Sequence, residues 1–264
     1  MTEWLAYLGT GAVVGFAAGL LGIGGGVVMV PLLVWTFTSH GLPAEHVVHL
    51  AIGTALAAMV FTSIASMRAH HVRGAVDWSI ARAMATGMLA GSFIAALIAG
   101  FIPTRPLAVG FTVLVFYAAT QILLDLKPPG SRDLPGPLGL FSVGAFIGAV
   151  STMLAAGGAF LTIPFLAWCK VPLRRAIGTA AANGLPIAIA GTAGYILHGL
   201  RVDGLPRPSL GYVYLPALAL VVTTSMLAAP LGARLAHSLP VKRLRTIFAM
   251  LLYFFAVKML VGVW

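Results

Sequence analysis

The chain has 264 residues, of which 60% are hydrophobic and only 8% are charged. A soluble domain carries about 25% charged residues, so the composition excludes a soluble enzyme and a disordered chain. The single cysteine, Cys169, excludes a disulfide framework and a cysteine-rich metal site. The net charge of +10 comes from Lys and Arg scattered between apolar runs, as in membrane loops, and does not indicate nucleic acid as a partner.

Ten apolar runs follow one another along the chain, five in each half. They lie at about 5–21, 27–37, 46–67, 79–101, 105–124, 138–155, 159–169, 174–198, 211–237 and 241–262. About 20 helical residues cross the ~30 Å hydrocarbon layer, so the last three runs of each half are long enough to span it. The run 27–37 has about 11 residues, or ~16 Å of helix, and is too short. The pattern predicts an all-α polytopic membrane protein without a cleaved N-terminal signal.

An internal repeat divides the chain into two similar halves. Residues 11–35 align without a gap with residues 144–168, and the Ala-Ile-Gly-Thr-Ala motif at 51–55 recurs at 176–180. We expect a first repeat at 1–126, a polar cytoplasmic linker at 127–133 and a second repeat at 134–264, integrated into one membrane domain. In each repeat the first two runs form a glycine-broken, re-entrant-like helical hairpin that precedes three spanning helices.

The basic residues predict how the chain is oriented in the membrane. If each hairpin returns to its own side and the other three helices cross, all but four of the 16 Lys and Arg residues face the cytoplasm. Both termini then lie outside. Three crossings in each half make the two repeats inverted, which is a recurring architecture of secondary transporters. Two full crossings by the hairpin helices would leave the sides of all loops unchanged, so re-entry stays open at this point.

Glycine clusters stand between the two helices of each predicted hairpin, and the candidate substrate-binding glycines are Gly24, Gly25, Gly26, Gly157 and Gly158. A turn inside the membrane is tolerated only within protein or beside a watery cavity, because unpaired backbone groups are costly in hydrocarbon. The helix after each turn presents free N–H groups and a partial positive charge, which form an anion site. The glycines four residues apart at 11 and 15 and at 144 and 148 instead favour close helix packing.

Hydroxyl and amide side chains stand near these glycines in the repeat. Thr54 and Thr179 occupy the same place in the two motifs, and Asn183 lies one turn beyond Thr179. Ser151 and Thr152 precede the second glycine cluster. We predict that these five side chains contact the substrate. The alternative is that each threonine bonds to the carbonyl four residues earlier.

A metal centre or catalytic site finds little support in the sequence. The paired histidines His46, His49, His70 and His71 lie at run ends, and the six acidic residues lie at run ends or in loops. Proton and sodium relays usually use carboxylates buried in the membrane. We therefore predict no metal, cofactor or catalytic residue, and place His71 and Arg73 on the path by which an anion enters.

The glycine motifs resemble a known family. The segment 15–33, Gly-Phe-x-x-Gly-Leu-Leu-Gly-Ile-Gly-Gly-Gly followed by Val-Pro-Leu-Leu, is similar to the signature of the TauE/SafE sulfite exporter family, and 148–164 is similar to its second copy. The resemblance covers about 10–262. It implies an inner-membrane transporter of sulfite, sulfoacetate or other small sulfonates or organic acids. Ala155, Ala156 and Ala159 depart from the glycine-rich first copy, where Gly22 and Gly26 stand at the places of Ala155 and Ala159.

These observations together predict a secondary transporter or facilitator, not an enzyme, that exports a small sulfur oxyanion or organosulfonate across a bacterial-type inner membrane. Its partners are a small anionic substrate and the lipid bilayer, and a homo-oligomer is compatible with the sequence. Three alternatives stay open: an importer of a small carboxylate or sulfur compound, a histidine-based membrane metalloenzyme, and a non-transporting accessory membrane protein.

Overall fold

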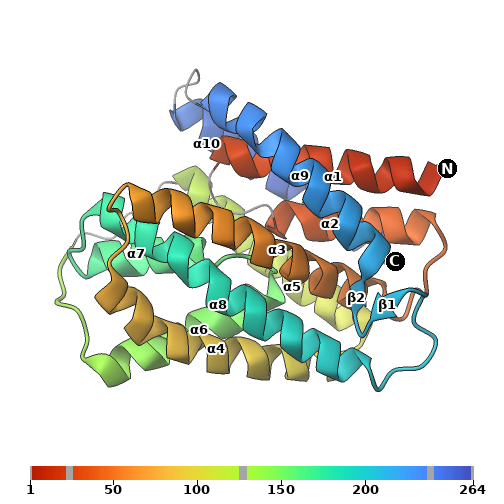
Figure 1. Ribbon diagram of the computed structural model, residues 1–264, viewed down its shortest axis with the longest axis horizontal. Coiled ribbons are helices and arrows are strands. Elements are labelled where there is room, and N and C mark those ends of the chain that lie inside the picture. Colours follow the sequence, from red (N-terminus) through yellow and green to blue (C-terminus); the bar gives the residue numbers. More distant parts are fainter. Residues whose placement is uncertain (1, 22–25, 125–129, 237–240, 263–264) are drawn as a thin grey trace.

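The fold is given by a computed structural model, which describes residues 2–21, 26–124, 130–236 and 241–262. The described residues form helices and one two-stranded antiparallel hairpin (Figure 1). The helices of the first repeat are α1 (Thr2–Leu21), α2 (Gly26–Ser39), α3 (Val47–Val72), α4 (Trp78–Phe101) and α5 (Thr104–Leu124). Those of the second are α6 (Pro137–Met153), α7 (Ala159–Trp168), α8 (Leu173–Gly199), α9 (Leu215–Ala236) and α10 (Val241–Gly262).

Each predicted apolar run contains a helix, and two boundaries differ from the prediction by four residues or more. Helix α3 continues to Val72, beyond the predicted end at residue 67. Helix α9 begins at Leu215, whereas the run was expected to begin at 211, because the preceding residues form the strands β1 (Ser209–Leu210) and β2 (Val213–Tyr214). Gly211 adopts a φ of 54° between the strands, which glycine allows without steric cost. The apolar residues of the hairpin continue into α9 without a break in hydrophobicity, so the sequence pattern predicted one helix here.

Helix length separates spanning from non-spanning elements for five of the six runs predicted to span, whereas α10 contributes only the shorter apolar stretch Ala249–Met259 among the described residues. Helices α3, α4, α5, α8 and most of α9 are long and apolar enough to cross a membrane among the described residues. Helices α2 and α7 have 14 and 10 residues, or about 21 and 15 Å of helix, and are too short to cross ~30 Å. The all-α polytopic membrane fold is therefore confirmed.

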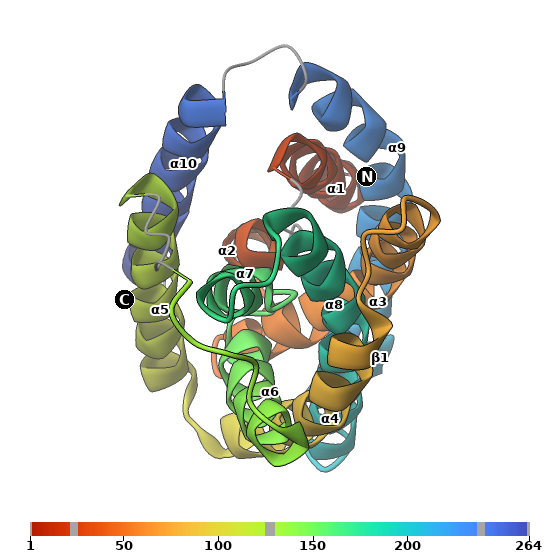
Figure 2. The same cartoon turned by 90° about the vertical axis from the view of Figure 1, so that its left-hand side faces the viewer.

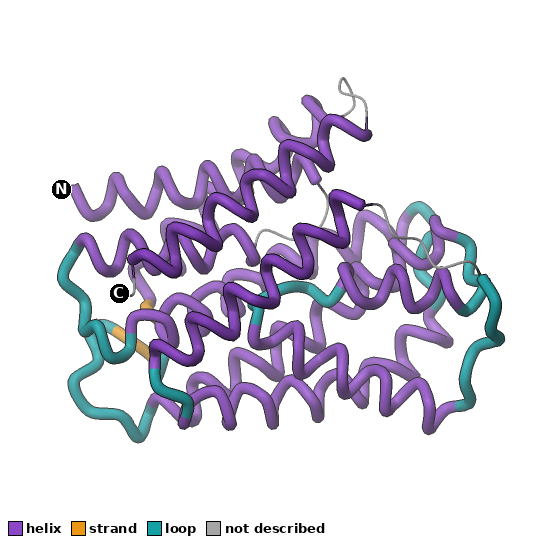
Figure 3. Tube along the Cα trace, turned by 180° about the vertical axis from the view of Figure 1, so that it is seen from behind, coloured by secondary structure: helices purple, strands orange, loops and turns teal. Residues whose placement is uncertain are grey.

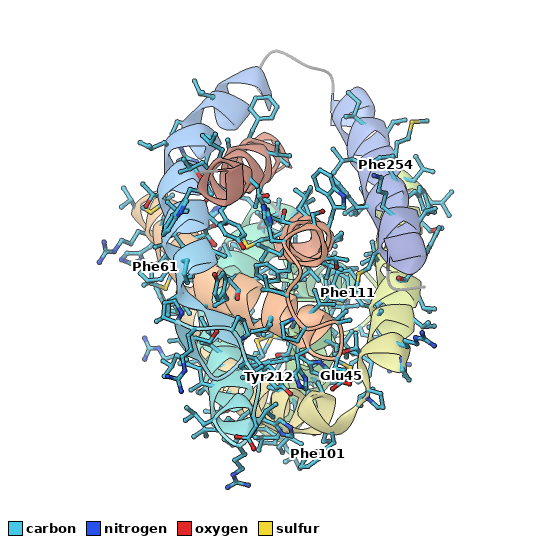
Figure 4. The ribbon with its side chains drawn as sticks, turned by 90° about the vertical axis from the view of Figure 1, so that its right-hand side faces the viewer. Glu45, Phe61, Phe101, Phe111, Tyr212 and Phe254 are labelled. Atoms are coloured by element: carbon cyan, nitrogen blue, oxygen red, sulfur yellow. The ribbon has the colours of Figure 1, made fainter. Side chains whose placement is uncertain are left out.

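Side-chain burial fits a bilayer environment. Figure 4 shows Phe61 and Phe254 pointing outward, and these rings are 48% and 57% exposed, while Phe111 inside the bundle is 1% exposed. Many large apolar side chains on the outer surface would be unfavourable in water, but they match the hydrocarbon of a membrane. Among the five candidate membrane spans, helix α3 is the most enclosed, and its residues from Val47 to Met59 are all buried.

Helices of each repeat pack against helices of the other repeat. Helix α1 lies along α9 and helix α6 along α4 (Figure 2). The expected close packing at the spaced glycines is confirmed, because a Cβ on Gly11 would lie 2.7 Å from the Val221 carbonyl oxygen and one on Gly148 would lie 2.6 Å from that of Met88. Helices α5 and α10 pair with each other at the edge of the bundle. The inverted orientation of the repeats stays a prediction.

The two ends of the bundle carry different elements. Helix α1 begins and helix α10 ends at the same end as the β1–β2 hairpin, in both Figure 1 and Figure 3. The last turn of α3 and the first turn of α8 lie at the opposite end (Figure 1). We call these the hairpin end and the His70 end.

Candidate substrate cavity

The start of α2 meets the turn that joins α6 to α7 inside the bundle. Gly26, the first residue of α2, packs so closely on the second turn that a Cβ atom at this position would overlap the carbonyl oxygen of Ala155. Ala155 adopts a positive φ of 46°, which is uncommon for a residue other than glycine. The direct contact between Gly26 and Ala155 therefore brings the start of α2, in the first repeat, against the turn of the second repeat.

A cavity of about 470 Å³ lies beside this meeting point. Its walls come from both repeats: Gly26 and Met29 of α2, Met59 to His70 along α3, Gly157 and Ala159 at the second turn, Ala180 to Gly184 of α8, and Ser225 to Pro230 of α9. Cavities of this size, largely apolar and with a few polar groups, are typical of small-molecule sites. The lining reaches His70, near the end of α3, so the cavity lies toward the His70 end of the bundle.

One face of α3 supplies most of the polar groups in the cavity. Thr62, Ser63, Ser66 and His70 line it from this helix, and Ser225 lines it from α9. Thr62 and Ser225 donate to the carbonyls of Met59 and Val222 on their own helices. The hydroxyls of Ser63 and Ser66 make no hydrogen bond within the described part of the chain. They are therefore available to a ligand.

Two helices begin at the cavity wall. Helix α2 begins at Gly26 and helix α7 at Ala159. Gly158, the N-cap of α7, has a φ of 72°, which favours glycine. In the described residues the N–H groups of Ala159 and Phe160 have no acceptor. No Asp, Glu, Lys or Arg occurs among the described lining residues, so no carboxylate there offsets the partial positive charge that helix N-termini carry.

The glycines predicted from the sequence fall into three groups. Gly24 and Gly25 lie outside the described residues. Gly26 and Gly157 line the cavity. Gly158 lies just behind it, where a Cβ would be 2.8 Å from the Ile187 side chain and 3.3 Å from Ser151 Oγ.

Three predicted polar residues are buried behind the second turn. Ser151 and Thr152 have no exposed surface, and Asn183 is 1% exposed. The hydroxyls of Ser151 and Thr152 and the Oδ1 atom of Asn183 have no hydrogen-bond partner among the described residues. They do not line the cavity, although Gly184, the next residue after Asn183, does.

Thr54 and Thr179 are engaged elsewhere. Thr54 Oγ1 accepts the N–H of Tyr214 at 3.0 Å, and Thr179 Oγ1 accepts the N–H of Asp77 at 3.0 Å. Both side chains are fully buried and neither lines the cavity. Each hydroxyl of the repeated motif therefore holds a backbone segment of the other repeat.

His71 and Arg73 lie on the surface at the His70 end. His71 Nδ1 accepts a hydrogen bond from Trp78 Nε1 at 3.1 Å, and the carbonyl of Arg73 accepts one from Arg174 at 2.8 Å. It is the neighbouring His70 that lines the cavity. The role of His71 and Arg73 in guiding an anion stays a prediction.

The polar face of α3 is the part of the site that the sequence analysis missed. Ser63, Ser66 and His70 are three and four residues apart, which places them on one side of a helix. That spacing was visible inside an otherwise apolar run. Nothing in the sequence, however, indicates that this side faces the glycine turns rather than another helix.

Among the residues that the structure describes, no three His, Cys, Asp or Glu side chains gather as metal ligands. His49 Nε2 faces the carbonyl oxygens of Ala99 and Ile102 at 3.2 and 3.0 Å. Two carbonyl acceptors require a donor, so this nitrogen carries a proton and has no lone pair for a metal.

Comparison with known proteins agrees with this geometry. Residues 7–259 match the family described as Sulfite exporter TauE/SafE. A probable membrane transporter protein of Haemophilus influenzae is 36% identical over 251 residues, covering 94% of this chain and 95% of that protein. Another, from Methanocaldococcus jannaschii, is 25% identical, covering 92% of this chain and 90% of that protein. No solved structure matches the chain. The chain therefore belongs to the TauE/SafE sulfite exporter family and is a membrane transporter, not an enzyme.

Proposed function

We propose that this transporter moves a small sulfur oxyanion or organosulfonate out of the cell and binds it in the cavity between the two glycine turns. The observation that carries the proposal is the meeting of two helix N-termini at a cavity with no Asp, Glu, Lys or Arg among its described lining residues. Helix N-termini stabilise an anion without the desolvation cost of burying a lysine or arginine.

The polar groups suggest how the anion is held. Its oxygens accept hydrogen bonds from the N–H groups of Ala159 and Phe160 and from the hydroxyls of Ser63 and Ser66, which have no other acceptor among the described residues. Met29, Met59 and Met226 contact the apolar part of an organosulfonate. Methionine side chains adapt to irregular shapes, which suits a site that accepts several small sulfonates.

The orientation that the basic residues predict places the His70 end in the cytoplasm of a bacterial-type inner membrane. The anion then enters past His70, with His71 and Arg73 nearby at the surface. One repeat rocks against the other to expose the site at the hairpin end. With the cell interior negative, 100 mV contributes about 2.3 kcal/mol toward the efflux of each negative charge.

The test is flux in proteoliposomes under an imposed membrane potential. Sulfite, thiosulfate, sulfoacetate, sulfolactate and acetate are compared, with and without a pH gradient. We expect saturable flux of at least one sulfur compound and little flux of acetate. Equal flux of acetate, or no flux of any anion through folded protein, would contradict the proposed substrate class.

A matched pair of variants tests the position of the site. A Cβ on Gly157 meets no atom closer than 3.9 Å, so Gly157→Val fills the cavity without a steric clash at the Cβ. Gly110→Val adds the same atoms to the exposed surface of α5, where a Cβ meets nothing within 4 Å. We expect Gly157→Val to reduce flux at least about tenfold, the effect of 1.4 kcal/mol, and Gly110→Val to leave it unchanged.

A further inference from the structure

The Gly-Thr pair that recurs in both repeats forms two matched docking sites for loops. Gly53 receives the carbonyl of Tyr212, where a Cβ would be only 2.5 Å from the oxygen, and Thr54 accepts the N–H of Tyr214. Gly178 receives the carbonyl of Ala75 so closely that a Cβ would overlap it, and Thr179 accepts the N–H of Asp77. Each site thus binds the segment that leads into the fourth helix of the other repeat.

The two docking sites are secured by different chemistry. At the His70 end, Arg174 donates to the carbonyl of Arg73 at 2.8 Å, and Arg175 lies 3.8 Å from the carboxylate of Asp77. Arginine keeps its charge at every physiological pH. At the hairpin end, Tyr212 takes the place of Ala75, and the contacts are aromatic. The rings of His46, His49 and His198 lie 6.0, 5.0 and 5.9 Å from the Tyr212 ring.

The hairpin closes the bundle at the end opposite the cavity. Tyr212 and Val213 are each 2% exposed, and the Tyr212 ring stacks on His49 of α3 and His198 of α8. Leu56, Ile187 and Tyr195 are fully buried on the same two helices, α3 and α8. A substrate leaving by the hairpin end must therefore pass the docked hairpin.

Two of the three histidine rings around Tyr212 stack on it. The Tyr212 ring is nearly parallel to those of His49 and His198, at 24° and 13°. His49 donates from Nε2 to the carbonyls of Ala99 and Ile102, and its Nδ1 faces the hydroxyl of Thr104 at 3.5 Å. Burial raises the pKa of Tyr212, so its phenol stays neutral and does not offset a charge on an imidazole.

The charged groups around the cluster do not compensate for protonation. Glu45 is exposed beside His46, Arg105 follows Thr104 on α5, and Arg201 follows His198 beyond α8. Their formal charges sum to +1 before any histidine binds a proton. Additional positive charge in a buried aromatic cluster is unfavourable because the ion loses its water and repels its neighbours.

We propose that His46, His49 and His198 form a proton-binding site that releases the β1–β2 hairpin and so couples opening at this end to the pH outside. The docked hairpin covers these rings, and its release exposes imidazoles of α3 and α8 to water, where an unperturbed histidine binds a proton with a pKa of about 6.5. Proton binding therefore favours release, which increases as the pH falls through this value. The coupling rests on the proposed transport function.

Accessibility of the hairpin to a thiol reagent tests the proposal without measuring transport. In the full protein with Cys169→Ser, Val213→Cys places a thiol at a buried hairpin position and Leu210→Cys places one at a position that is 45% exposed. The reaction rate of the Val213→Cys variant is divided by that of the Leu210→Cys variant, so that the pH dependence of thiol ionisation, which is common to both, cancels. We expect the ratio to rise about tenfold from pH 7.5 to 5.5 for one proton of ordinary affinity.

Histidine variants assign the proton. His49 bonds the end of α4, so its loss risks misfolding; His198→Gln and His46→Gln spare those bonds. We expect each variant to flatten the pH dependence of the ratio. A ratio that does not change with pH in the parent protein, or that changes in both variants as much as in the parent, would overturn the proposal. Absence of anion flux with a pH-dependent ratio would instead contradict the transport function and leave the proton site standing.

Discussion

Gly26 and Ala155 belong to different repeats and lie in direct backbone contact, because glycine leaves room for the Ala155 carbonyl. Each residue sits at the turn of a broken helical hairpin, and the cavity opens beside the contact. The pair therefore fixes the distance between the two helix N-termini that face the cavity. Adding a methyl group at this contact and adding one at a nearby cavity position are therefore expected to affect stability differently.

Gly26→Ala should destabilise the protein, whereas Gly157→Ala should not. The added methyl group at residue 26 overlaps a backbone oxygen, and such overpacking costs about 1–3 kcal/mol. At residue 157 the nearest atoms are 3.9 Å away. Thermal unfolding in detergent compares the two variants, and equal melting temperatures would show that the turns do not meet as described.

Ser63→Ala and Ser66→Ala should each raise the KM for the transported anion about tenfold. A hydrogen bond to a charged group contributes about 1.5–3 kcal/mol, and neither hydroxyl has another partner in the described residues. Flux measured against substrate concentration gives the KM. Ser142→Ala is the control, since Ser142 is exposed on α6 and donates to the Leu138 carbonyl. A KM that is unchanged in both cavity variants would remove α3 from the binding site.

Thr179→Val should lower the free energy of unfolding by about 1–3 kcal/mol, because it removes the oxygen that accepts the Asp77 N–H in a buried site. Thr54→Val should have a similar effect through the Tyr214 N–H. Thr179→Ser and Thr54→Ser keep the hydroxyl and should restore most of the stability. Thermal unfolding measures both pairs, and a serine variant as unstable as its valine counterpart would argue against the hydrogen bond.

Cys169 should react slowly with maleimides at neutral pH. The residue is 6% exposed, and burial raises the pKa of its thiol, with a smaller opposing effect from Arg132. A raised pKa leaves less thiolate, the reactive form, so the rate increases as the pH rises toward that value. Mass spectrometry after timed labelling compares it with Leu210→Cys. Reaction at the same rate would mean that the segment after α7 opens readily.

The order and nature of the helices could be predicted from the sequence because each apolar run must satisfy its own backbone in a membrane. The runs 138–155, 159–169 and 174–198 became α6, α7 and α8 with boundaries shifted by at most two residues. The hairpin before α9 could not be predicted, because Leu210, Val213 and Tyr214 suit a helix and a strand equally well. Its strands are defined by docking against Gly53, Thr54 and Gly199.

The site was predicted in part. The glycine turns and the anion-favouring helix N-termini follow from local chemistry, and Gly26 and Gly157 do line the cavity. The assignment of Thr54 and Thr179 to substrate contact followed from their repetition, but repetition also marks the two docking sites in which they lie. The polar face of Ser63, Ser66 and His70 could not be assigned to the cavity from the sequence. The spacing of residues shows which side of a helix they share, but it does not show which helix that side packs against.

The sequence by itself determined the membrane class, the duplication, the short and long helices and the glycine breaks, since these depend on local hydrophobicity, helix length and backbone freedom. Only the tertiary structure decided that the two turns meet at Gly26 and Ala155, that α3 turns its hydroxyls toward them, and that three histidines surround Tyr212. These relationships join residues far apart in the chain, and they depend on how the helices pack against one another.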